Sequence, residues 1–229
     1  MNPTQVIEYI KNKYNLKEDN TNPHVLKGAQ REQLYKLFAQ LGYTVGCEVG
    51  LEKGKNAQTM FECIPNLKLY AVDPYKQHPQ YSPAAKIYVR HWDENFLAGV
   101  KAQAQKRMQN RNAIIIEKFS EDAVKDIADN SLDFVYIDGD HSYDFVIQDI
   151  IIWGRKVRRG GIVSGHDYYY DSNKEGRIAK VTQAVNDYTR VHDIKFYITK
   201  EDRYVKNGDI PPSWFWVKTE EIYPNVVGA

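Results

Sequence analysis

The chain has 229 residues, 42% of which are hydrophobic, and a formal net charge of +1 at pH 7. Its length suits one domain with a sizeable core, and its near-neutral charge argues against a nucleic-acid partner. No apolar run approaches the roughly 20 residues of a membrane span, and the first residues lack the pattern of a secretory signal. We therefore expect a cytoplasmic protein, with no membrane partner, in which Cys47 and Cys63 are reduced and buried.

The first 43 residues are mostly polar and contain two helical patterns. A weak pattern covers residues 6–14, and a second, over residues 28–41, places Leu34 and Phe38 on one face before a stop signal at Gly42. We expect residues 1–43 to be an N-terminal helical extension packed on a core domain that spans residues 44–229.

Predicted strands and helices alternate through the core domain. Apolar runs of strand length cover residues 45–49, 67–73, 113–117, 132–138, 161–167, 195–199 and 213–218. Helical patterns cover residues 55–64, 92–110, 120–130, 143–155 and 178–190, and the basic residues and glycines at 156–161 are expected to end the fourth helix. This order predicts an α/β three-layer sandwich: a Rossmann-like, seven-stranded, mostly parallel sheet with a C-terminal antiparallel strand pair.

A glycine-bearing turn joins the first core strand to the first core helix. Gly50 and Gly54 flank this turn, where glycine allows a positive φ and lets a ligand approach the main chain. The free N–H groups at the start of the helix favour a polar or anionic ligand end. Asp73 ends the second strand, where a carboxylate can accept hydrogen bonds from a ribose diol. Together these features predict half of a nucleotide-type site.

Further polar residues fall at or just past the predicted strand ends. They are Glu48, Ser120, Glu121, Asp138, His166 and Asp167. Because the carboxyl ends of parallel strands lie along one edge of a sheet, we expect these residues to gather at one rim with Gly50 and Asp73.

The chain resembles class I S-adenosylmethionine-dependent methyltransferases in several motifs between residues 40 and 220. These are the turn Glu48-Val49-Gly50-Leu51-Glu52-Lys53-Gly54, Asp73, the turn Ser120-Glu121-Asp122-Ala123, the run Ile137-Asp138-Gly139-Asp140-His141-Ser142-Tyr143, and Gly160-Gly161 followed by His166-Asp167-Tyr168. The resemblance is to the branch that includes small-molecule and sugar O-methyltransferases, some of which depend on a metal.

The resemblance implies the cofactor S-adenosyl-L-methionine. Gly50 and Gly54 would make room for its methionine end, which Glu48 would help to fix, and Asp73 would hold the ribose. Tyr75 would lie along the adenine, whose edge Ser120 and Glu121 would meet. The implied cofactor contacts are Glu48, Gly50, Leu51, Gly54, Asp73, Tyr75, Ser120, Glu121 and Asp138. Two plainer interpretations stay open: Asp73 as a solvated strand-end acid, and Ser120 as a helix N-cap.

Methyl transfer to a hydroxyl requires removal of the hydroxyl proton, either by a general base or through a metal. His141 and Asp140, in the loop after the fourth strand, are the candidate catalytic residues, since histidine titrates in the useful range. An alternative is that His141 caps the next helix or pairs with a carboxylate.

Asp138, His166 and Asp167 are the candidate metal ligands, for Mg²⁺ or another divalent metal. Metal-dependent relatives carry an acid pair or an acid and an amide where this chain has His166-Asp167. Imidazole favours softer ions than Mg²⁺, so this difference argues against magnesium. The alternative is that His166 pairs with an acid and that no metal binds.

The sequence thus predicts a methyltransferase that acts on a small-molecule acceptor, at a hydroxyl oxygen, with a divalent metal as a candidate assistant. The alternatives are a non-catalytic S-adenosylmethionine-binding protein and a nicotinamide-dependent Rossmann oxidoreductase, which the Gly-x-x-x-Gly spacing disfavours. We expect residues 1–43, 75–95 and 168–177 to shape the acceptor pocket, with Tyr168-Tyr169-Tyr170 as candidate walls. The oligomeric state, including a homodimer, stays open.

Overall fold

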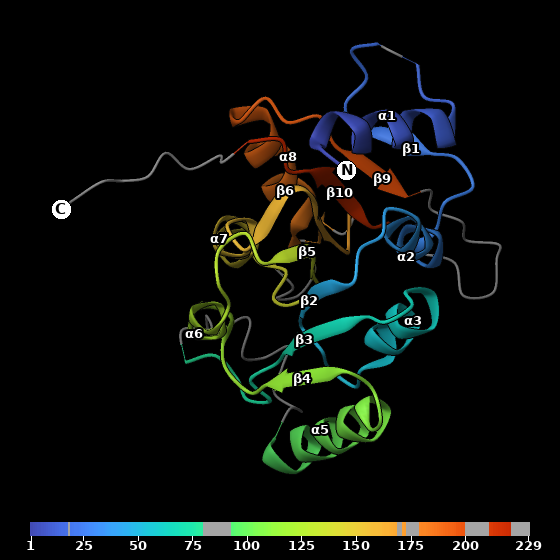
Figure 1. Cartoon of the computed structure of the whole chain (residues 1–229). Helices are drawn as coiled ribbons and strands as arrows, with labels where there is room; N and C mark the ends of the chain where they lie inside the picture. Colours follow the sequence, from blue (N-terminus) through green and yellow to red (C-terminus); the bar gives the residue numbers. More distant parts are fainter. Residues whose placement is uncertain (18, 80–92, 169–170, 173–178, 200–210, 221–229) are drawn as a thin grey trace.

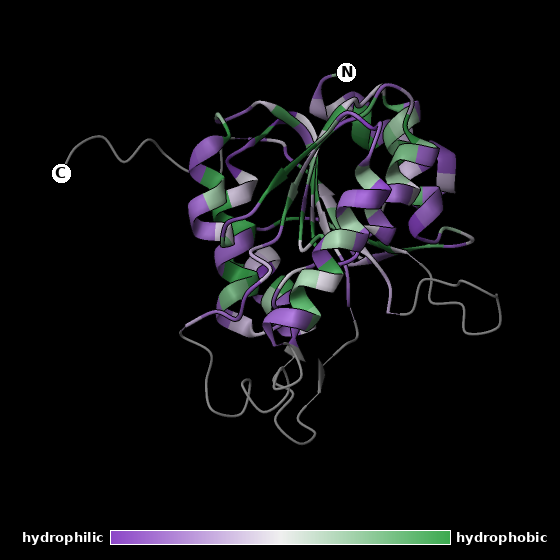
Figure 2. Ribbon diagram, turned by 90° about the horizontal axis from the view of Figure 1, so that it is seen from below, coloured by the Kyte–Doolittle hydropathy of each residue, from purple (hydrophilic) through white to green (hydrophobic). Residues whose placement is uncertain are grey.

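The fold is a twisted sheet covered by helices on both faces (Figures 1 and 2). A computed structural model describes residues 1–17, 19–79, 93–168, 171–172, 179–199 and 211–220. Within these residues the main sheet has 8 strands in the order β1-β9-β10-β6-β5-β2-β3-β4. This arrangement confirms the predicted α/β sandwich with a mostly parallel sheet.

The centre of the sheet is parallel, as the alternation of strands and helices predicts. Its strands are β2 (Val45–Val49), β3 (Lys68–Val72), β4 (Ala113–Ile116), β5 (Leu132–Ile137) and β6 (Val157–Gly165). The strand β10 (Trp214–Val217) runs antiparallel to both β6 and β9 (Tyr197–Thr199), so the predicted terminal pair is confirmed. The carboxyl ends of β2, β3, β5 and β6 therefore share one edge.

An additional edge strand, β1 (His24–Leu26), pairs in parallel with β9. The sequence did not predict it, because a run of three residues is too short to show a periodicity. The segment 1–43 therefore supplies a strand as well as helices to the fold.

Two sets of helices cover the two faces of the sheet (Figure 1). One face carries α1 (Pro3–Tyr14), α2 (Arg31–Gln40), α3 (Lys55–Cys63) and α5 (Glu94–Met108). The other face carries α6 (Ser120–Ala123), followed by a short 3₁₀ turn, then α7 (Tyr143–Gly154) and α8 (Val181–Val191). The hydropathy colouring shows apolar residues gathered between the helices and the sheet (Figure 2).

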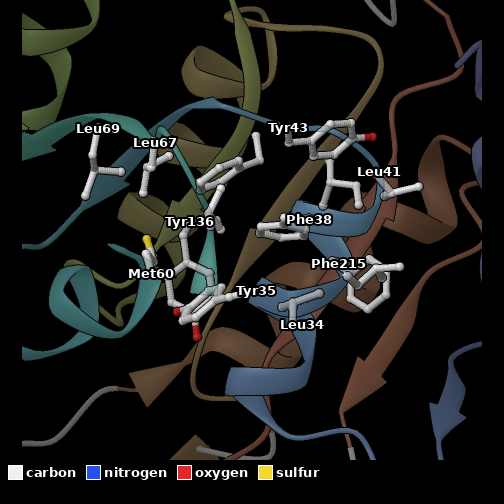
Figure 3. Close-up of a cluster of buried hydrophobic side chains, with 14 of the residues drawn as sticks. Leu34, Tyr35, Phe38, Leu41, Tyr43, Met60, Leu67, Leu69, Tyr136 and Phe215 are labelled. Carbon is white, nitrogen blue, oxygen red and sulfur yellow. The ribbon is translucent and has the colours of Figure 1, made fainter. Parts of the chain in front are cut away.

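Aromatic side chains of α2 anchor the N-terminal segment to the sheet (Figure 3). The ring of Phe38 lies 4.6 Å from that of Phe134 on β5, and Tyr35 meets Tyr136 edge-on at 5.6 Å. All four side chains are fully buried. Burial of aromatic area on this scale makes α2 part of the main core.

The prediction that residues 156–161 only end a helix is wrong. The helix α7 stops at Gly154, and β6 begins at Val157, so these residues form the first half of a strand. The pairing of β6 with β5 shifts register between Leu132 and Phe134, and Gly160 adopts a φ of 74°. An irregular, glycine-containing strand start has the same composition as a helix end, which explains the error.

A small second sheet also escaped prediction. The two-residue strands β7 (Asp171–Ser172) and β8 (Ala179–Lys180) pair antiparallel, and α8 begins directly after them at Val181.

Both cysteines are free thiols, with Cys47 buried and Cys63 half-buried. Among the described residues, no helix combines the length and the apolar character needed to cross a membrane.

The centre of the sheet leaves no room for a side chain at Gly46 on β2. A Cβ atom there would overlap the ring of Phe134, whereas a Cβ at Gly99 on the exposed face of α5 would meet nothing within 4 Å. We expect Gly46→Ala to lower the free energy of unfolding by about 1–3 kcal/mol through overpacking. The control Gly99→Ala should raise it by about 0.5–1 kcal/mol through helix propensity. Thermal denaturation measures both, and equal melting temperatures would contradict the packing described here.

Candidate active site

The glycine turn after β2 packs directly on the end of β5. Gly50 has a φ of +97°, and a Cβ at this position would overlap the main-chain carbonyl oxygen of Asp138. The N–H of Gly50 donates to Val72 O on β3 at 2.9 Å, and the N–H of Asp138 donates to Val49 O at 2.7 Å. The ends of β2, β3 and β5 are thus in contact, and the predicted gathering of Gly50, Asp73 and Asp138 at one rim is present.

Glu48 is a fully buried acid on β2. Its Oε1 accepts a hydrogen bond from Asn56 Nδ2 at 2.7 Å, while its Oε2 has no hydrogen-bond partner among the described residues. Burial raises the pKa of Glu48 to about 8, against the opposing effect of the Asn56 hydrogen bond. A buried carboxyl oxygen without a partner is costly, and a ligand with N–H groups would satisfy it.

Asp73 accepts two main-chain hydrogen bonds at the end of β3. Its Oδ2 receives the N–H of Glu52 at 2.8 Å and its Oδ1 receives that of Tyr75 at 2.8 Å. Burial raises the pKa of Asp73, and these two hydrogen bonds oppose that rise. A carboxylate can accept about four hydrogen bonds, so both oxygens keep capacity for hydroxyl donors.

Tyr75 folds back over the glycine turn, with its hydroxyl donating to Glu52 O at 3.2 Å. Its φ of 47° is unusual for a bulky residue, and it turns the chain sharply after Asp73. This position agrees with the predicted side of the cofactor site, next to Asp73.

The side chains of Ser120 and Glu121 are half-buried, and each contacts another side chain of the protein. Ser120 Oγ donates to Asp149 Oδ1 and accepts from Trp153 Nε1 at 2.7 Å, both on α7. Glu121 Oε1 lies 3.1 Å from His78 Nε2. The N-cap of α6 is Phe119 and makes no side-chain cap, so the alternative of Ser120 as an N-cap is wrong.

Two histidines and two acids form a cluster between the ends of β5 and β6. His141 Nε2 lies 2.9 Å from Asp167 Oδ2, and His166 Nδ1 lies 3.2 Å from Asp167 Oδ1 and 3.7 Å from Asp138 Oδ1. Asp167 therefore bridges both imidazoles, one with each oxygen. The predicted alternative in which His141 pairs with a carboxylate describes this geometry.

Asp140 has a different role from His141 in the same loop. Its Oδ1 accepts the N–H of Ser142 at 2.8 Å, which shapes the turn that leads into α7. This contact stabilises the loop and leaves the second oxygen for other donors.

The charges of the cluster shift its pKa values in opposite directions. Burial alone would raise the pKa of Asp167, but hydrogen bonds from His141 and His166 outweigh it and hold the pKa well below its usual range. Burial would lower the pKa of His141, but the hydrogen bond and charge of Asp167 outweigh it and raise the pKa. Burial raises the pKa of Asp138 to about 6, with His166 opposing the rise.

Within the part of the chain that the structure describes, one group of side chains has donor atoms close enough to hold a metal ion. Donor atoms of Asp138, His141 and Asp167 all lie within 4.8 Å of one another. This set contains His141 where the sequence predicted His166. The two carboxylates suit Mg²⁺ or Mn²⁺ and the imidazole suits a softer divalent ion, so the donor chemistry is compatible with a metal.

Arg31 and Asn56 also contact residues of the site, and neither was predicted from the sequence. Arg31 Nη1 donates to Asn56 Oδ1 at 3.3 Å, and Tyr35 donates its hydroxyl to the same oxygen at 2.6 Å. Asn56 follows the glycine turn by two residues, and a polar residue there could have been noticed. Nothing local distinguishes Arg31, because its partner His166 lies 135 positions away.

The predicted walls of the acceptor pocket are described only in part. Residues 80–92, Tyr169, Tyr170 and residues 173–178 lie outside the described residues. Tyr168 is buried, and its hydroxyl donates to Asn186 Oδ1 at 2.8 Å on α8, so it packs in the core.

Comparisons with known proteins agree with this geometry. A family model described as a methyltransferase domain matches residues 47–168. Solved structures with a similar fold include the O-methyltransferase NovP, with a TM-score of 0.59, 16% identity and coverage of 87% of this chain and 84% of NovP. No curated protein sequence matches the chain.

Two further solved structures show that this fold serves different acceptor atoms. The O-methyltransferase TomG from Streptomyces achromogenes, in complex with S-adenosylmethionine, has a TM-score of 0.55, 11% identity and coverage of 94% of this chain and 89% of TomG. The N-methyltransferase NodS from Bradyrhizobium japonicum has a TM-score of 0.51, 9% identity and coverage of 83% and 95%. At these identities the likeness shows the fold alone.

The buried Glu48 should make stability depend on pH. Its pKa is about 8 in the folded protein and near 4.5 when unfolded, so the folded state binds the extra proton between these values. The contribution of Glu48 to stability is therefore most favourable below pH ~4.5 and is lost as pH rises to about 8. We expect the melting temperature of Glu48→Gln, minus that of the wild type, to increase as the pH is raised across this window. The increase should be about 2–4 °C for each kcal/mol of stability that the wild type loses. A constant difference between the two proteins would show that Glu48 is ionised throughout.

Proposed function

Given that the chain belongs to the methyltransferase-domain family matched over residues 47–168, and is an S-adenosylmethionine-dependent enzyme, we propose that it methylates a hydroxyl oxygen of a small-molecule acceptor. The observation that carries the proposal is the His141–Asp167 pair, 2.9 Å between Nε2 and Oδ2, at the same rim as the glycine turn. Family membership leaves no place for the alternative of a nicotinamide-dependent oxidoreductase.

The cofactor's methionine end is assigned to the turn between β2 and α3. Gly50, Leu51 and Gly54 would leave the main chain accessible there, and the unpartnered Oε2 of Glu48 would accept a hydrogen bond from the methionine ammonium group. Pairing with a cation would lower the pKa of Glu48, so binding near neutral pH would release a proton.

The nucleoside end is assigned to the ends of β3 and β5. The two oxygens of Asp73 would accept the ribose hydroxyls, with Tyr75 beside the adenine and Asp138 at the adjoining strand end. Ser120 contacts Asp149 and Glu121 contacts His78, so these two side chains would lie behind the adenine and support its site.

His141 is assigned as the general base. Asp167 accepts the Nε2–H of His141 and so keeps the ring proton on that atom, which makes Nδ1 the basic nitrogen. Nδ1 would take the acceptor's hydroxyl proton while the oxygen attacks the methyl carbon in line with the carbon–sulfur bond. Bound S-adenosylmethionine would supply the methyl group, and its positively charged sulfur would take the electrons of the broken carbon–sulfur bond. Asp140 would hold the loop that carries His141.

A divalent metal is the alternative means of activating the acceptor. Asp138, His141 and Asp167 would hold it, and it would supply positive charge that lowers the pKa of a bound hydroxyl. Because the base role and the ligand role use the same imidazole, they are competing assignments for His141.

The base assignment is tested by His141→Ala. Isothermal titration should show that S-adenosylmethionine binds the wild type and the variant alike, because His141 lies on the acceptor side. Methyl transfer to a panel of small hydroxyl compounds should fall by about 10²–10⁴-fold, the usual effect of losing a general base. The control His192→Ala, an exposed residue beyond α8, should keep full activity. Binding without turnover by the wild type would support a non-catalytic protein instead, and loss of cofactor binding by His141→Ala would contradict its place in the site.

The metal assignment is tested by Asp138→Asn and Asp167→Asn. Each change removes one carboxylate from the donor set, so the affinity for Mg²⁺ and Mn²⁺ should fall by an order of magnitude or more, about 1.4 kcal/mol for each factor of ten. Calorimetric titration of the metal into the cofactor-free protein provides the measurement. Unchanged metal affinity in both variants would place the ion elsewhere or remove it from the proposal.

A further inference from the structure

Arg31 brings a positive charge from the N-terminal segment to the rim. It is the first residue of α2, a helix that packs on α3, and its side chain crosses to the end of β6. Nη1 donates to Asn56 Oδ1 at 3.3 Å, and Nη2 lies 2.7 Å from His166 Nε2. Arg31 thereby contacts both Asn56, which donates to Glu48, and His166, which contacts Asp167.

The chemistry of this contact fixes the protonation of His166. A guanidinium is always charged in proteins and can only donate hydrogen bonds. His166 Nε2, 2.7 Å from Nη2, must therefore accept, which leaves the ring proton on Nδ1. The Nδ1–H group faces Asp167 Oδ1 at 3.2 Å and Asp138 Oδ1 at 3.7 Å, both of which are acceptors.

The fixed proton has a consequence for cation binding. An imidazole nitrogen binds a metal through its lone pair, and the nitrogen of His166 that faces the two carboxylates carries a proton instead. The described contact of His141 is instead with the carboxylate of Asp167, and a metal can displace the proton from the nitrogen that faces this acid. With the proton on Nε2, the lone pair of Nδ1 would face both acids and add a second nitrogen ligand.

We propose that Arg31 is a positioning residue that holds His166 in the Nδ1–H tautomer and so keeps it from binding a cation. A set with one imidazole has a weaker preference for nitrogen-preferring ions such as Ni²⁺, relative to Mg²⁺, than a set with two. Arg31 thus determines the metal preference of the site without touching the metal. The inference on metal preference rests on the proposed metal site, whereas the tautomer does not.

The first measurement is the tautomer of His166 in the metal-free protein. Long-range ¹H–¹⁵N spectra at neutral pH distinguish a protonated from an unprotonated ring nitrogen, with His166→Gln supplying the assignment. Wild type should show a proton on Nδ1 alone. Arg31→Met should lose this preference, and Arg31→Lys, which can still donate to Nε2, should keep it. A wild-type ring protonated on Nε2, or on both nitrogens, would overturn the inference whatever the protein catalyses.

The second measurement is the ratio of Ni²⁺ to Mg²⁺ affinity, from calorimetric titration of each metal. Arg31→Met should raise this ratio by roughly 10–100-fold, the range typical of changes just outside a metal's ligands. The control Arg190→Met removes a positive charge from an exposed position on α8, where the side chain is 74% exposed, and should leave the ratio unchanged. Melting curves identify a variant that fails to fold, in which case Arg31→Leu replaces Arg31→Met and the same rise in the ratio is expected.

The outcomes separate this inference from the proposed function. An unchanged ratio in Arg31→Met, with the wild type binding both ions, would overturn the role of Arg31 and leave the metal site standing. Absence of divalent binding in the wild type would remove the metal site and the preference together, and the tautomer would then be decided by the spectra alone.

Discussion

The site depends on the close approach of the Gly50 turn to the main chain of Asp138. Any side chain at Gly50 would overlap the Asp138 carbonyl oxygen, so only glycine allows the two strand ends to meet. This contact places the acid of β5 beside the turn before α3 and brings Asp73 in through the hydrogen bond from Gly50 N to Val72 O. A common edge for the residues proposed to hold the cofactor and the acceptor follows from this one backbone contact.

A second constraint is the burial of several acids at one edge of the sheet. Burial raises the pKa of Glu48, Asp73 and Asp138, so the folded protein disfavours the charged forms of these side chains. Asp167 is the exception, because two imidazoles donate to it. A rim of under-compensated acids favours cationic groups, and both a sulfonium nucleoside and a divalent ion are cationic. The electrostatics and the family membership therefore point to the same class of ligand.

The sequence predicted what depends on local pattern and missed what depends on distant partners. The alternation of apolar strands with helices was sufficient for the sheet, and the rule that ligands lie at strand carboxyl ends was sufficient to gather Gly50, Asp73 and Asp138. Residues 156–161 were assigned wrongly because basic residues and glycines are shared by helix ends and irregular strands. Arg31 could not be read from the sequence, because its contact with His166 spans 135 residues, and the choice between His141 and His166 as a donor depends on side-chain distances that the sequence does not carry.

The pairing of β1 with β9 has a consequence for the order in which the chain assembles. His24 pairs with Tyr197, so β1, the first strand to be synthesised, cannot pair until β9 has also been synthesised. At roughly 5–20 residues per second, that delay is on the order of ten seconds or more during synthesis. Until β5 and β6 have been synthesised, the apolar faces of α1 and α2 lack the strands on which they pack, and during this time the nascent chain is most open to chaperones and proteases. The candidate site, which brings together Arg31 from the early segment and His166 from a later one, can form only after residue 166 has been synthesised.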